Sequence, residues 1–142
     1  MPTLQLKVSP LQNPERCQAL AVALTLLTAQ LLGKRPEVTV VVVEDLPAAR
    51  WYVGGQDAQR PTALLEIDIT QGTNTPAEKT NFMAAAFAEL QRQLGGSTGA
   101  LEAASYVIVR EVPAPDWGYG GVTQLARRVM GPPAAQPPAP SA

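Results

Sequence analysis

The residue with the most distinctive chemical potential is the proline at position 2. If Met1 is removed, Pro2 begins the chain with a secondary amine. Burial in an apolar pocket disfavours the charged form of such an amine and lowers its pKa below the usual α-amino value of about 7.7–8.0. A neutral amine near pH 7 can act as a general base or a nucleophile. Pro2 is therefore the first candidate catalytic residue; the alternative is that proline merely permits removal of Met1.

The absence of histidine and the single cysteine exclude several kinds of catalytic mechanism. The 142 residues include no histidine and one cysteine, Cys17. Without histidine there is no Ser-His-Asp or Cys-His catalysis and no ordinary histidine zinc site. A single cysteine excludes an intrachain disulfide and a cysteine metal cluster. The chemistry must use the terminus, lysine, arginine, tyrosine or carboxylates, and we expect neither a metal nor a cofactor.

The overall charge disfavours two classes of partner. A net charge of −1 provides no basic field for nucleic acid or for an anionic membrane surface. No window approaches the ~20 continuous apolar residues of a membrane span, and the start of the chain does not resemble a signal peptide. We expect a cytoplasmic protein that binds a small molecule. Charged residues make up only 16%, as expected if part of the surface is buried in an oligomer.

The first half of the chain predicts a strand, a helix and a second strand. Apolar and polar residues alternate through residues 3–9, which is the period of a strand. Asn13 followed by Pro14 predicts the start of a helix, and Gly33 predicts its end. The valine-rich segment 37–44 predicts a strand with both faces buried.

The second half repeats this order. Residues 63–70 predict a strand, the capping box at 75–78 begins a helix that runs to about residue 94, and residues 106–111 predict a fourth strand. The motif Trp51-x-x-Gly-Gly recurs at Trp117, in the same place relative to the strands. Both tryptophans could close a pocket, or pack in the core or between subunits.

Duplication of a βαβ unit predicts one α/β domain over residues 1–130, with repeats at 2–60 and 61–128. The two units should form a four-stranded sheet with both helices on one face. No further element is left to cover the other face, so we expect another subunit there. Residues 131–142 are rich in proline and alanine and predict a disordered tail.

The duplicated unit, Pro2 and the Gly-Gly loops after the second and fourth strands together resemble the tautomerase superfamily. That superfamily includes 4-oxalocrotonate tautomerase, macrophage migration inhibitory factor (MIF) and related bacterial dehalogenases and decarboxylases. The resemblance covers about residues 2–128. It implies a homotrimer whose N-terminal proline is the catalytic base. It also implies a keto–enol isomerase (tautomerase) that acts on a small 2-oxo carboxylic acid.

Short motifs are most similar to the MIF branch. The turn 33–36 resembles its Gly-Lys-Pro-Pro turn, which implies that Lys34 binds the substrate carboxylate. Residues 61–64 resemble the start of its third strand, which implies that Ile69 lies at an apolar pocket wall. Tyr106 matches an active-site tyrosine, implying a donor to the enol oxygen from an adjacent subunit.

Each of these residues also has a structural interpretation. Lys34 could simply complement the dipole at the end of a helix, and Tyr106 could be an ordinary packing residue of a strand. Arg35 is an alternative anion-binding residue beside Lys34. Arg110 shares a strand face with Tyr106 and could supply the same contact. The sequence leaves open which of the three cations holds the carboxylate.

Departures from the family patterns limit the substrate. Ile108 stands where the MIF branch has asparagine, and Gln12 and Thr39 stand where the oxalocrotonate branch has arginines. Residues 70–73 lack the paired arginines of the cis-type dehalogenases. These departures favour a substrate with one carboxylate. The alternatives are hydration, decarboxylation or dehalogenation of a 3-carbon acid with protonated Pro2, or a non-catalytic trimer.

Overall fold

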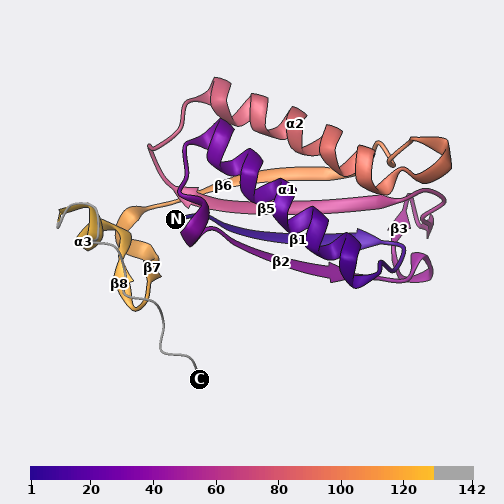
Figure 1. The fold of residues 1–142 in the computed structure, drawn as a ribbon, viewed down its shortest axis with the longest axis horizontal. Helices are drawn as coiled ribbons and strands as arrows, with labels where there is room; N and C mark the ends of the chain where they lie inside the picture. The colour runs from indigo at the N-terminus through magenta and orange to yellow at the C-terminus, as the bar shows by residue number, and fades with distance from the viewer. Residues whose placement is uncertain (130–142) are drawn as a thin grey trace.

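The computed structural model describes residues 1–129, and the predicted tail at 131–142 lies outside that part. The described residues form a four-stranded sheet with two long helices packed on one face (Figure 1). This arrangement confirms the fold class predicted from the sequence. The sheet consists of β1 (Thr3–Ser9), β2 (Val40–Asp45), β5 (Thr62–Thr70) and β6 (Tyr106–Val112), and the helices are α1 (Pro14–Leu32) and α2 (Pro76–Leu94).

The strand order β2-β1-β5-β6 reflects the repeated unit. In each unit the two strands are parallel, because a helix connects them, and the units meet along the antiparallel pair β1 and β5. The N-terminus, the end of α1, the start of α2 and the ends of β5 and β6 therefore gather at one end of the sheet (Figure 1). We call this the Pro2 end, and the opposite one the Tyr106 end.

Small hairpins follow the second strand of each unit. The hairpin after β2 lies at the Tyr106 end, and the hairpin after β6 lies beyond the Pro2 end (Figure 1). Trp51 and Trp117 immediately precede these hairpins, so they lie at opposite ends of the sheet. The first hairpin pairs β3 (Tyr52–Val53) with β4 (Gln56–Asp57), and the second pairs β7 (Gly118–Tyr119) with β8 (Val122–Thr123). The short helix α3 (Gln124–Val129) follows β8. Short 3₁₀ turns span Pro36–Val38, Ala48–Arg50, Gly96–Thr98 and Ala114–Asp116.

The helix ends match the capping signals in the sequence. The Asn13 side chain accepts a hydrogen bond from the Arg16 backbone N–H at 2.7 Å. Thr75 and Glu78 form the predicted capping box, with bonds of 2.8 and 3.1 Å. Gly33 ends α1 with a φ of 66°, a conformation that favours glycine. No helix of the described residues is long and apolar enough to cross a membrane.

The core lies between the helices and one face of the sheet. The prediction that the second strand is buried on both faces is wrong for the single chain. As an edge strand it exposes 48% of Val40 and 56% of Val42 on the face that no helix covers. It also begins at Val40, because residues 36–38 form a 3₁₀ turn. The core includes Leu4, Leu6, Val8, Leu20, Leu24, Leu65, Ile67, Ile69, Phe82, Ala86 and Leu90.

Candidate active site

Pro2 lies at the edge of the core, one residue before β1, and is buried. Its carbonyl oxygen accepts a hydrogen bond from the Val40 backbone N–H at 3.2 Å. Thr3 pairs with Asp68 in the sheet, so the next step of the same register places Pro2 beside Ile69. Because Ile69 is only 1% exposed, the proline has an apolar neighbour on the sheet.

The environment of the chain terminus lowers the pKa of an amine. With Met1 present, burial lowers the pKa of the Met1 amino group below its usual value, and the positive charges of Lys34 and Arg35 lower it further. Removal of Met1 moves the terminal amine to Pro2, one residue closer to the core. We expect the same causes, desolvation and neighbouring cations, to lower the pKa of the Pro2 secondary amine.

Lys34 is held at the same end of the sheet by the terminus of α1. The Lys34 backbone N–H donates to the Thr28 carbonyl at 3.4 Å, which completes the C-cap formed with Gly33. The Lys34 Nζ donates to Thr73 Oγ1 at 2.8 Å, and Thr73 Oγ1 donates to the Thr70 carbonyl at 2.6 Å. These contacts direct the ammonium group toward the turn between β5 and α2.

Burial lowers the pKa of Lys34, while the carboxylates of Glu78 and Glu111 act in the opposite sense. Glu78 belongs to the capping box of α2. Glu111 pairs with Ile69 across β5 and β6. The Pro2 end of the sheet thus combines a buried proline, an apolar neighbour and a partly desolvated cation with acidic neighbours.

Two further residues of this end were not assigned a role from the sequence. Lys79 lies in the first turn of α2, and its Nζ is 3.6 Å from Glu111 Oε1. Val107 and Val109 pack against the core, so Glu111 faces the helices by alternation. The capping box predicts that Lys79 lies near the start of a helix. The rotation of that helix about its axis, which turns Lys79 toward β6, cannot be predicted from local sequence patterns.

Tyr106 and Arg110 lie on the face of the sheet that the helices do not cover. Tyr106 is 63% exposed and begins β6 at the far end from Pro2. Arg110 donates to Glu66 Oε2 at 2.7 Å and to Asp68 Oδ1 at 3.1 Å. Arg110 pairs with Asp68, which in turn pairs with Thr3, so Arg110 lies toward the Pro2 end on the uncovered face, whereas Tyr106 lies at the other end. The roles of both residues in the site remain predictions.

The two tryptophans have different surroundings. Trp51, Leu64 and Tyr106 are among the residues that line a pocket of about 310 Å³ at the Tyr106 end. Trp117 is half-buried beyond the Pro2 end, and its Nε1 is buried without a hydrogen-bond partner among the described residues. Trp117 therefore lies on the side of the Pro2 end, and Trp51 lies at the Tyr106 end.

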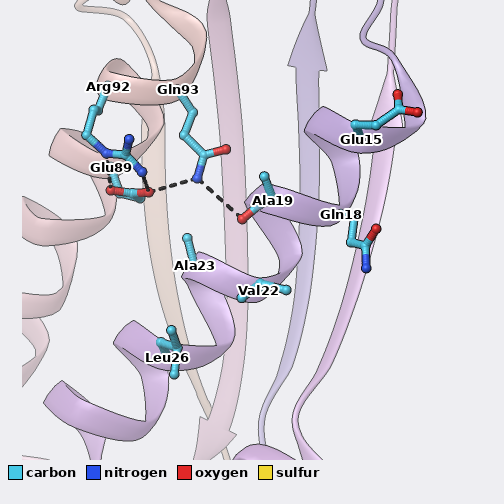
Figure 2. Close-up of a pocket in the computed structure, with 9 residues that line it drawn as sticks. All are labelled: Glu15, Gln18, Ala19, Val22, Ala23, Leu26, Glu89, Arg92 and Gln93. Carbon is cyan, nitrogen blue, oxygen red and sulfur yellow. Dashed lines mark hydrogen bonds and ion pairs between the residues drawn. The ribbon is translucent and has the colours of Figure 1, made fainter.

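A separate groove of about 570 Å³ lies between the outer surfaces of α1 and α2 (Figure 2). Val22 and Leu26 contribute apolar surface, and the Gln93 side chain crosses between the helices. It donates to Glu89 Oε1 at 2.7 Å and to the Ala19 carbonyl at 3.3 Å. This groove contains none of the predicted site residues. Within residues 1–129 there is also no cluster of three or more potential histidine, cysteine or carboxylate metal ligands.

The family comparison agrees with the sequence resemblance. Residues 2–58 match the family model described as tautomerase enzyme. No curated protein matches the sequence. The matched segment contains Pro2 and Lys34 and ends before the second repeat. The resemblance to the tautomerase superfamily is confirmed.

Solved structures of similar fold cover most of the chain, including the second repeat. A fused 4-OT, described as a wild-type symmetric trimer, is 22% identical, with a TM-score of 0.74 over 87% of this chain and 97% of that chain. A member of the cis-3-chloroacrylic acid dehalogenase family is 21% identical, with a TM-score of 0.72 over 85% and 82%. A MIF-like protein from Entamoeba histolytica is 18% identical, with a TM-score of 0.66 over 86% and 97%. The four-stranded sheet with two helices is therefore the fold of these three proteins.

Proposed function

We propose that this protein is a keto–enol tautomerase that acts on a small 2-oxo carboxylic acid and uses the Pro2 amine as its general base. The observation that carries the proposal is the environment of the chain terminus. Burial and two cations lower the pKa of an amine there, and Lys34 supplies a positive charge at the same end of the sheet. The proposed reaction requires at least a base that removes the proton and a group that binds the carboxylate of the substrate.

In the proposed reaction, Lys34 binds the substrate carboxylate through a charge-assisted hydrogen bond. The neutral Pro2 nitrogen removes a proton from the carbon next to the carbonyl, and the C–H electron pair forms the C=C bond of an enolate. Protonated Pro2 then returns the proton to the oxygen, which gives the enol. A developing enolate needs a preorganised donor, and we assign that role to Tyr106 of a neighbouring subunit.

In a homotrimer, a neighbouring subunit would bring its Tyr106 to the Pro2 end of the sheet. The uncovered face of the sheet has apolar residues on its two edge strands, with Val40 and Val42 on β2 and Ile108 on β6. Its centre is polar and includes the Arg110 ion pairs. Apolar edges can pack against neighbouring subunits, while a polar centre can remain hydrated around the symmetry axis. The fused 4-OT of the same fold is described as a trimer.

The second candidate function is hydration or dehalogenation of a 3-carbon acid. A protein of the same fold belongs to a dehalogenase family, and Glu111 is a carboxylate that could orient a water near Pro2. In this chemistry Pro2 remains protonated and acts as an acid. The low amine pKa favours the base, so we rank the tautomerase first. A non-catalytic trimer is the remaining alternative.

Intact mass of the purified protein first establishes whether Met1 is removed, because a retained methionine would block the amine. Processed protein should then accelerate ketonisation of an enol arylpyruvate, followed by ultraviolet absorbance. A panel of 3-carbon unsaturated and halogenated acids tests the second candidate. Processed protein that is inactive on every enol acid but active on the 3-carbon acids would reverse our ranking, and inactivity on both would leave the non-catalytic trimer.

A further inference from the structure

Glu111 lies between two lysines at the Pro2 end of the sheet. Its carboxylate is 3.6 Å from Lys79 Nζ, and its charge also raises the pKa of the half-buried Lys34. In the sheet it pairs with Ile69, the neighbour of Pro2. The Pro2 end of the sheet therefore has a second cation, Lys79, with the carboxylate of Glu111 beside it.

The Lys79–Glu111 pair is partly shielded from water, since the two side chains are 25% and 28% exposed. The separation of 3.6 Å exceeds that of an ordinary charge-assisted hydrogen bond, which is about 2.7–2.9 Å. The carboxylate of Glu111 thus offsets the charge of Lys79 without accepting a hydrogen bond from its ammonium group. Without the carboxylate, Lys79 would present an unpaired positive charge at the same end of the sheet as Lys34.

We propose that Glu111 is a specificity-determining residue that restricts this site to substrates with one carboxylate. Its carboxylate offsets the positive charge of Lys79, so that the carboxylate of the substrate is bound by Lys34. Its negative charge would also repel a second carboxylate that approached Lys79. The inference rests on the proposed function, because it concerns the substrate of that same site.

The direct test compares two enol acids, a monocarboxylate (enol arylpyruvate) and a dicarboxylate (enol oxaloacetate). The kcat/KM ratio for dicarboxylate over monocarboxylate is measured for wild type, Glu111→Gln, Lys79→Gln and the double variant. Freeing one charge-assisted hydrogen bond should raise the ratio about ten- to a hundredfold in Glu111→Gln. The double variant should lose most of this increase, because the responsible cation is gone.

Two controls separate specificity from damage to the fold. Glu89→Gln removes a carboxylate of α2 that pairs with Arg92 outside this site, and its ratio should equal that of wild type. Glu111→Asp retains the negative charge and should keep the preference for the monocarboxylate. Thermal unfolding of each variant verifies that the compared proteins are folded.

A binding measurement does not depend on turnover. Calorimetry with butyrate and glutarate should show that wild type prefers butyrate and that Glu111→Gln shifts the preference toward glutarate by a similar factor. If wild type converts neither enol acid but Glu111→Gln still shifts the binding preference toward glutarate, the proposed function fails and the specificity inference stands. If wild type is an active tautomerase but Glu111→Gln changes both substrates equally, or the double variant keeps the shift, the inference is overturned alone.

Discussion

Lys34 and Thr73 join the end of α1 to the turn that precedes α2, because the Lys34 Nζ donates to Thr73 Oγ1 at 2.8 Å. The contact links the two βαβ repeats at the Pro2 end of the sheet. It also orders a long side chain that otherwise has several rotamers. A cation ordered before the substrate arrives binds a carboxylate at a lower entropic cost.

Replacing Lys34 tests the assignment of the anion site. Lys34→Gln should raise the KM for a 2-oxo acid about ten- to a hundredfold, with a smaller change in kcat, because a carboxylate contact is made equally in substrate and transition state. Steady-state kinetics measure both parameters. Arg35→Gln is the matched control, since the Arg35 guanidinium already pairs with Glu37 at 2.7 Å. A larger KM effect in Arg35→Gln than in Lys34→Gln would transfer the anion site to Arg35.

Thr73→Val removes the acceptor of the Lys34 ammonium group and keeps a side chain of similar volume. The lysine should remain charged but less well positioned. Loss of one such hydrogen bond corresponds to about 0.5–1.5 kcal/mol, or roughly two- to tenfold in KM. Thr25→Val is a suitable control, because its hydroxyl bonds only within α1, to the Ala21 carbonyl. An equal KM effect in both variants would show that Thr73 has no special role.

The pH dependence of kcat/KM should show a rising limb from the Pro2 amine. The neutral amine is the active form, so activity rises as the pH passes its pKa. Burial and the charges of Lys34 and Arg35 lower the pKa of an amine at the terminus, which places this limb below about 7.7–8.0. Removing the Lys34 charge raises the amine pKa and should move the limb to higher pH. Profiles of wild type and Lys34→Gln that coincide would contradict the coupling.

The location of a site residue can be predicted from the sequence when a single local feature of the chain determines it. Pro2 is defined by its place in the chain, and Lys34 follows the glycine that ends α1. Tyr106 was recognised, but its location at the far end of the sheet depends on the pairing of β5 with β6. The Lys79–Glu111 pair depends on how α2 is rotated against β6. Pairing register and helix rotation are tertiary properties that local patterns do not contain.

The edge strand β2 provides a test of assembly. Val42 is 56% exposed on the uncovered face, and a trimer would bury it. Val42→Lys should therefore weaken the trimer and reduce turnover, because Tyr106 of the neighbour would no longer approach Pro2. Light scattering should show a shift toward the 15.0 kDa monomer. Val22→Lys on the outer helical surface is the control, and wild type that is already a stable monomer would remove the shared site.

Replacing the base tests the proposed chemistry itself. Pro2→Ala keeps a terminal amine but makes it primary, more flexible and better hydrated. Loss of a positioned general base costs about 10²–10⁴ in rate, so the variant should retain only a small residual activity. Intact mass must show that Met1 is absent from both proteins, since removal of Met1 is needed to expose either amine.

The same loss should follow when the amine is blocked without changing the residue. Wild type with Met1 retained, or with an added N-terminal tag, should be inactive yet unfold at a temperature close to that of processed protein. Its Pro2 nitrogen is then an amide and cannot accept a proton. Activity in the blocked protein, or a Pro2→Ala variant as fast as wild type, would show that Pro2 is not the base and that another residue performs the proton transfer.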